Sequence, residues 1–117
     1  MIIQQIANDI VILIREGKNK QAKNLYYSDD ITSIEGNGDT LQGIEAIRQK
    51  STNWATQVAQ VHSASVSDPL IAADHFSLHI NMDISYKNGY RAIMDEIAVY
   101  GVKDGKIAFE QYFFKAS

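Results

Sequence analysis

The fold of this chain is decided by residues 75–114, HFSLHINMDISYKNGYRAIMDEIAVYGVKDGKIAFEQYFF. Apolar and polar residues alternate from Phe76 to Tyr86, which is typical of a strand with one face on a core and the other toward solvent. Asn88-Gly89 and Asp104-Gly105 are residue pairs preferred in two-residue hairpin turns, because both turn positions require positive φ. The stretch therefore predicts three consecutive antiparallel strands.

Three helices are predicted ahead of these strands. Apolar residues recur every three or four positions in the first helix at Ile3, Ile6, Ile10, Leu13 and Ile14, and in the third at Ile44, Ile47, Ser51, Trp54 and Val58. A shorter second helix is predicted over residues 20–27, and a short strand over residues 31–35. From about residue 57 onward the period is two. This order predicts a single α+β domain over residues 1–117, with the helices packed on one face of the sheet.

The register of the strands follows if both turns hold two residues. Met82 then lies opposite Asp95, and Val99 lies opposite Glu110, so both carboxyl groups and Tyr112 point toward the helices. A bulged three-residue loop in the first hairpin would instead turn Asp95 outward and Glu96 inward. With two-residue turns, Glu96 is expected on the outer face.

Carboxyl groups on an apolar inner face are costly unless they are hydrogen-bonded or neutral. Asp95 and Glu110 in one low-dielectric pocket would raise at least one pKa, which suits general acid or base catalysis near neutral pH. The alternative is a structural hydrogen-bond network to Tyr112, Tyr26 or the backbone. Glu35, beside the glycine-containing turn after residues 31–35, is either a strand-end residue or a catalytic base.

Composition narrows the class of partner. The net charge is −3 and no lysine or arginine cluster relieves it, which argues against nucleic acid. The chain has no cysteine, so neither a disulfide framework nor a thiolate metal site or nucleophile is expected. Its apolar start is interrupted by polar residues and no apolar run is long enough to span a membrane, so neither a signal peptide nor a membrane span is expected. A cytoplasmic location is compatible with these features. His75, His79 and Asp83 share one face of a strand and could imitate a metal site. A flat pair of histidines on a sheet rarely completes a coordination sphere without a third convergent ligand, so no metal site is predicted.

Two stretches carry a family resemblance: LYYSDDITSIEGNGDTLQGIEAIRQK at residues 25–50 and MDEIAVYGVKDGKIAFEQYFF at residues 94–114. They resemble the SnoaL-like branch of the nuclear transport factor 2-like superfamily. The resemblance implies a cone-shaped cystatin-like roll, in which three N-terminal helices close a curved, mainly antiparallel sheet around a deep pocket, commonly as a homodimer. Members include polyketide cyclases, ketosteroid isomerase, scytalone dehydratase, limonene epoxide hydrolase and proteins of no established activity.

The resemblance also implies roles for particular positions. Glu35 matches the proton-shuttling carboxylate of the isomerases and cyclases, and Asp95 matches the protonated acid of the isomerase oxyanion hole. Ile10 stands where the isomerase has an oxyanion-hole tyrosine. Since isoleucine cannot donate a hydrogen bond, this departure argues against steroid isomerase activity of that kind.

These observations predict a small-molecule-binding protein, either an acid/base isomerase, cyclase or dehydratase acting on an apolar carbonyl compound, or a non-catalytic ligand-binding or dimeric interaction module. Glu35 would move the proton, while Asp95 or Tyr112 would stabilise an enolate. Glu110 is a candidate catalytic residue as the carboxyl partner of Asp95. No cofactor is expected. A homodimer that forms through the outer face of the sheet is expected. The residues expected to line the pocket are Tyr26, Trp54, His62, Met82, Ile97 and Phe114.

Overall fold

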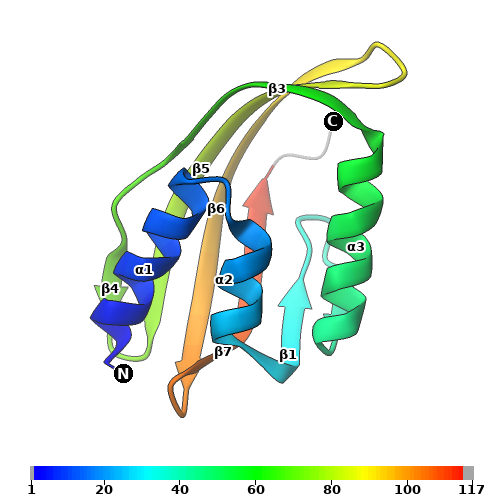
Figure 1. The fold of residues 1–117 in the computed structure, drawn as a ribbon. Coiled ribbons are helices and arrows are strands. Elements are labelled where there is room, and N and C mark those ends of the chain that lie inside the picture. The colour runs from blue at the N-terminus through cyan, green and yellow to red at the C-terminus, as the bar shows by residue number, and fades with distance from the viewer. Residues whose placement is uncertain (1, 115–117) are drawn as a thin grey trace.

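The structure is a computed structural model that describes residues 2–114 (Figure 1). Its elements are α1 (Ile3–Arg15), α2 (Asn19–Tyr26), β1 (Tyr27–Ile34), β2 (Thr40–Gln42), α3 (Ile44–Gln57), β3 (Val58–Val66), β4 (Leu70–Ala72), β5 (His75–Tyr86), β6 (Arg91–Lys103) and β7 (Lys106–Phe114). The prediction of three helices followed by a run of strands is confirmed. The first strand begins at Tyr27, four residues earlier than its β-branched composition indicates, so Tyr27 belongs to a strand and not to the second helix.

The sheet has the order β2-β1-β7-β6-β5-β3, and β4 pairs with β5. All pairings are antiparallel except β1 with β7, which run parallel. The sheet is therefore mixed and unclosed, with β2 and β3 at its edges. It curves strongly, and the three helices lie on its concave side, as Figure 1 shows. The predicted cone-shaped α+β fold is confirmed.

The helices cover the sheet with the apolar stripes that the sequence predicts. α1 buries Ile6, Ile10 and Leu13 and ends where Gly17 takes a φ of 72°, a left-handed conformation that costs glycine little. α3 buries Ile44 and Ile47. No helix in residues 2–114 is long and apolar enough to cross a membrane.

The core joins these stripes to the inner face of the central strands. Phe76, Leu78 and Ile84 of β5 are 1%, 1% and 0% exposed, as the alternation predicts. Phe76 stacks on Tyr100 of β6 with ring centroids 4.8 Å apart. Helices and strands thus share one apolar cluster, and the polar inner residues lie beside it.

The β5–β6 register differs by one residue from the two-residue prediction. The loop holds three residues, because the Tyr86 amide donates to the Tyr90 carbonyl at 2.8 Å and only Gly89 of the Asn88-Gly89 pair has positive φ. A one-residue slip reverses the face of every later side chain. Asp95 therefore lies opposite Asn81 on the outer face, and not opposite Met82.

Glu96, opposite Ile80, takes the inner position in place of Asp95. In the second hairpin the two-residue turn is confirmed, since Asp104 and Gly105 have φ of 53° and 76°. A β-bulge between Gly101 and Val102 then shifts the β6–β7 register. The two irregularities compensate, so Glu110 still faces inward, now opposite Tyr100 and not opposite Val99.

Candidate functional site

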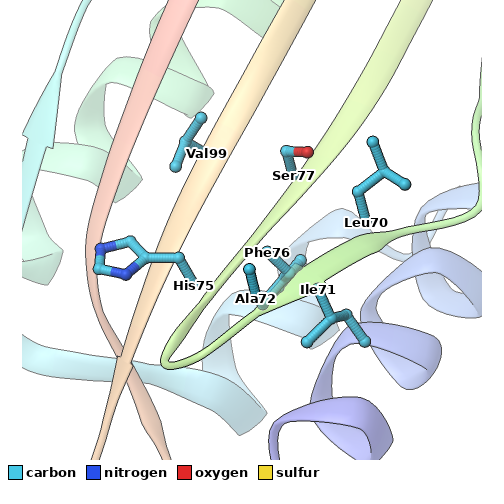
Figure 2. Close-up of a pocket in the computed structure, with 7 residues that line it drawn as sticks. All are labelled: Leu70, Ile71, Ala72, His75, Phe76, Ser77 and Val99. Carbon is cyan, nitrogen blue, oxygen red and sulfur yellow. The ribbon is translucent and has the colours of Figure 1, made fainter.

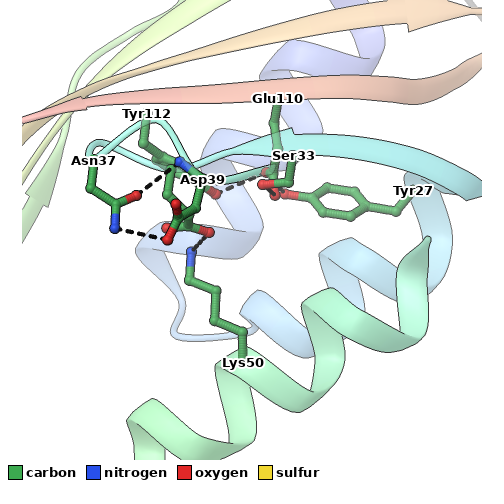
Figure 3. Close-up of polar contacts among 8 residues, drawn as sticks. Tyr27, Ser33, Asn37, Asp39, Lys50, Glu110 and Tyr112 are labelled. Atoms are coloured by element: carbon green, nitrogen blue, oxygen red, sulfur yellow. Dashed lines mark hydrogen bonds and ion pairs between the residues drawn. The ribbon is translucent and has the colours of Figure 1, made fainter. Parts of the chain in front are cut away.

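Glu110 lies on the inner face of β7 and is 1% exposed, at the centre of a group of hydroxyl donors (Figure 3). The hydroxyls of Tyr27 and Tyr112 donate to its Oε2 at 2.5 and 2.8 Å, and the Ser33 hydroxyl donates to Oε1 at 3.1 Å. Because an ionised carboxylate is a pure acceptor, it takes all three donors without conflict. The cost of burying Glu110 is thereby offset by hydrogen bonds.

The parallel pairing of β1 with β7 creates this arrangement. It sets Ser33 directly beside Glu110 and brings Tyr27 from the start of β1 to the same carboxylate. Burial raises the pKa of Tyr27 and Tyr112 well above the ordinary tyrosine value, and the negative charge of Glu110 raises both further. Burial likewise raises the pKa of the neighbouring Tyr100. These phenols stay protonated and remain donors at neutral pH.

Glu35 follows the end of β1 and is paired with Lys50 of α3. The Lys50 ammonium also lies 5.1 Å from the ring centroid of Tyr112, within cation–π range. The turn after Glu35 is tied by its amide, which donates to the Asp39 carbonyl at 2.8 Å, and by Asn37 side-chain bonds to Asp39. The side chain of Glu35 is only 17% exposed, so its carboxylate is largely shielded from solvent.

Glu96 completes the group. It is half-buried, and burial raises its pKa; Lys50 opposes this effect, while the charges of Glu35 and Glu110 add to it. Three carboxyl groups and Lys50 therefore lie close enough to influence one another. Two of the acids differ in environment: Glu35 has a cationic partner, and Glu96 has a desolvated site.

The structure brings together three of the four predicted catalytic residues, Glu35, Glu110 and Tyr112. The inner placement of Asp95 is wrong, because the three-residue loop turns it outward, where its Oδ1 lies 2.6 Å from His79 Nε2. The hydrogen bond from His79 holds the pKa of Asp95 below its ordinary range. The outer placement of Glu96 is wrong for the same reason.

The predicted pocket residues divide between the two faces. Met82 lies on the inner face of β5, and the ring of Phe114 covers Gly36, where an added Cβ would sit 2.5 Å from its Cε1. Trp54 of α3 is half-buried, and its Nε1 is buried without a hydrogen-bond partner in residues 2–114. Tyr26 is buried, but its hydroxyl bonds Asp9 of α1 and not the carboxyl group of Glu110.

His62 and Ile97 are on the outer face, so their assignment to the pocket is wrong. A β-bulge between Val61 and Ser63 re-aims His62, whose Nε2 lies 2.7 Å from the outer Ser85 hydroxyl. Ile97 is turned outward with Asp95 by the register and is 44% exposed.

Sequence reasoning missed Tyr27, Ser33 and Lys50 as parts of the site. Lys50 could have been found, because it stands four positions before Trp54 on the inner stripe of the predicted third helix. Tyr27 and Ser33 carry no such local signal, since their role depends on pairing with the other end of the chain.

Two shallow hollows lie elsewhere on the sheet. One, of about 260 Å³, lies between β4 and β5 and is lined by Leu70, Ile71, Ala72, His75, Phe76, Ser77 and Val99 (Figure 2). The other, of about 320 Å³, is lined by His79, Asp95, Glu96, Ile97 and Phe113. Apart from Glu96, neither hollow includes a member of the polar group around Glu110.

Comparison with known proteins identifies relatives over the whole domain. A family model for the SnoaL-like domain matches residues 1–114. A Mesorhizobium loti protein, provisionally described as a SnoaL-like polyketide cyclase and as a carbohydrate phosphatase, is 38% identical, with a TM-score of 0.91 over 97% of this chain and 100% of that one. A comparison with curated proteins returns no match.

More distant structures share the fold alone. A protein from Pseudomonas putida KT2440, provisionally described as a polyketide cyclase, is 14% identical with a TM-score of 0.76, over 98% of this chain and 92% of that one. A Catenulispora acidiphila protein with a ketosteroid isomerase-like fold, in complex with trimethylamine, is 18% identical with a TM-score of 0.75. The match covers 96% of this chain and 86% of that one. Together with the cone-shaped fold and the family match over residues 1–114, these findings show that the chain belongs to the SnoaL-like family.

Proposed function

We propose that this protein binds a small, mostly apolar carbonyl compound on the concave side of the sheet and transfers a proton by cofactor-independent acid/base catalysis, as an isomerase, cyclase or dehydratase. The observation that carries the proposal is the contrast between Glu35, paired with Lys50, and Glu96, whose pKa is raised by burial. Two carboxyl groups in unlike environments, one beside a cation and one desolvated, are suited to act as base and acid on one substrate.

In this proposal Glu35 is the base. Held beside Lys50, Glu35 removes a proton from the carbon next to the substrate carbonyl. The negative charge that develops on the carbonyl oxygen needs a hydrogen-bond donor. Tyr112 already donates to Glu110 at 2.8 Å. Glu96, whose pKa is raised by burial, is therefore assigned as the donor in this proposal, and it takes the role that the family resemblance suggested for Asp95.

The proposal is tested by proton exchange on a simple ketone. The C1 protons of 2-tetralone exchange with deuterium in D₂O, and NMR follows the rate with and without the protein. We expect the wild-type chain to accelerate exchange and Glu35→Gln to lose about 100-fold of that acceleration, in the range of general-base effects. Glu45→Gln is the matched control, because Glu45 pairs with Arg48 on the exposed side of α3, the helix that carries Lys50, the partner of Glu35. Full acceleration in Glu35→Gln would remove Glu35 from the mechanism.

The second candidate is a non-catalytic interaction module that forms a homodimer through the outer sheet face. Its support is a group of exposed apolar side chains on that face: Ile93 is 62%, Ile97 44% and Phe113 50% exposed. Exposed apolar residues gathered on one surface favour a protein interface. Light scattering would detect a dimer, and Ile97→Lys should convert it to a monomer. A monomeric wild-type chain at high concentration would exclude this candidate.

A further inference from the structure

Trp54 is the one tryptophan of the chain and has no role in the mechanism proposed above. It stands one turn before the end of α3 at Gln57, and Figure 1 shows α3 on the concave side of the sheet. Among residues 52–57 its side chain is the only one that is not exposed, so this is the side chain that the end of α3 turns toward the sheet. The helix end is fixed there, because the Lys87 amide donates to the Gln57 carbonyl at 2.8 Å.

The indole nitrogen of Trp54 lacks an acceptor. Its Nε1 is buried and has no hydrogen-bond partner in residues 2–114, although the residue as a whole is only half-buried. A buried donor that makes no hydrogen bond is unfavourable and uncommon in native proteins. An indole N–H can only donate, so what satisfies it is an oxygen acceptor. Because part of the ring is exposed, a small rotation of the ring presents the N–H group to a ligand on the concave side.

Helix geometry sets Trp54 beside the proposed base. Lys50 stands four positions earlier, so the two side chains share one face of α3. Side chains on a helix lean toward its N-terminus, which brings the indole over the turn that carries Lys50. Lys50 pairs with Glu35, and its Nζ lies 5.1 Å from the ring centroid of Tyr112; Figure 3 shows its side chain directed from α3 at this polar group. Since four residues of helix span about 6 Å along the axis, a ligand of one ring reaches from Glu35 to Trp54.

The charges nearby decide which acceptor fits. Glu35, Glu96 and Glu110 place three carboxyl groups on the inner side of the sheet. A carboxylate or phosphate on the ligand would be repelled by such groups where they are ionised. A carbonyl or ether oxygen carries no net charge, so it accepts a hydrogen bond from the indole without that repulsion.

We propose that the Nε1–H group of Trp54 donates a hydrogen bond to a second, uncharged oxygen of the bound carbonyl compound, across a single ring from the carbonyl at which Glu35 acts. The inference rests on the proposed function, because the same compound is the ligand, and it adds the substrate class: cyclic diketones and related ring compounds with two oxygens. Trp54 would fix the orientation of the ring, so that the C–H bond beside the first carbonyl faces Glu35. A ketone with one oxygen would bind more weakly and in more than one orientation.

The indole itself reports on this contact. Because Trp54 is the one tryptophan, the isotope-labelled full chain gives a single indole N–H signal in an NMR spectrum. The chain is titrated with cyclohexane-1,4-dione and, separately, with 4-methylenecyclohexanone, in which a CH₂ group replaces the second oxygen. We expect the dione to move the indole proton signal downfield, as hydrogen bonding does, and the methylene compound to leave it in place.

Backbone amide shifts in the same titrations give the two affinities. The dione should bind about tenfold more tightly, the factor that one ordinary hydrogen bond contributes. An indole signal that stays in place at the highest dione concentration, or that moves equally with both compounds, would overturn the inference. Neither outcome depends on whether a variant folds.

Variants separate this result from that of the proposed function. Trp54→Phe keeps an aromatic ring but has no N–H donor, so it should bind the two ketones equally; a retained preference for the dione would also overturn the inference. Thr52→Ala, a change at an exposed position of the same helix, should keep the preference. A selective indole shift combined with full tetralone exchange in Glu35→Gln would refute the base and retain the Trp54 contact. Loss of exchange in Glu35→Gln without a selective indole shift would refute the contact and retain the base.

Discussion

Removing the Tyr27 hydroxyl tests whether the buried carboxylate depends on its donors. In Tyr27→Phe the ring stays in place, so no cavity opens, and only the 2.5 Å hydrogen bond to Glu110 is lost. A hydrogen bond to a charged group contributes roughly 1.5–3 kcal/mol. Since Glu110 is 1% exposed, no water replaces the donor, and we expect a loss near the upper end, about 2–3 kcal/mol. That is a large part of the stability of a small domain.

Urea unfolding followed by circular dichroism measures the loss, with the slope m checked for constancy. Tyr90→Phe is the matched control, because Tyr90 is 56% exposed, and its effect should stay within about 0.5 kcal/mol. A double-mutant cycle with Glu110→Gln should give a coupling energy of at least about 1 kcal/mol. A loss below about 0.5 kcal/mol in Tyr27→Phe with unchanged m, or strict additivity in the cycle, would refute this account of how Glu110 is buried.

Three further predictions follow from the inner and outer faces. Glu96→Leu should lower the rate of tetralone exchange by about 100-fold, as loss of an oxyanion donor does, whereas Asp95→Asn should leave the rate unchanged. The reverse result would show that Asp95 and not Glu96 faces inward, as a two-residue turn predicts. Because the folded pKa of Glu96 lies above its ordinary value of 4.5, the native state holds the extra proton, so its stabilising contribution is present below pH 4.5 and is lost as pH rises through the folded pKa. Urea unfolding across pH should show this decline in the wild type and not in Glu96→Gln. The hydrogen bond to Asp9 raises the pKa of Tyr26 to about 12, so NMR titration of Asp9→Asn should show Tyr26 ionising at lower pH than in the wild type.

Local patterns in the chain predict its three helices, its long C-terminal strands and its fold class, but not the short strands β2 and β4. Helical spacing of isoleucine and leucine in α1 and α3, and strict alternation in β5, predict which faces are buried because each period is a property of the local backbone. The inward direction of Glu110 is also predicted, although the predicted partner, Val99, is replaced by Tyr100 through the bulge at Gly101.

The identity of the second inner acid is not available from local pattern. Asn88-Gly89 suits a two-residue turn and a three-residue loop that ends in a left-handed glycine equally well, and only the packing of β5 on β6 selects the latter. The side-chain period of a strand is two, so this one added residue exchanges Asp95 for Glu96 at the concave face. Tyr27 and Ser33 reach Glu110 across 83 and 77 positions of sequence, through a parallel pairing of β1 with β7 that no neighbouring residues encode. Contacts of that range form only when the whole sheet assembles, and for that reason the donors of the buried carboxylate belong to the tertiary structure.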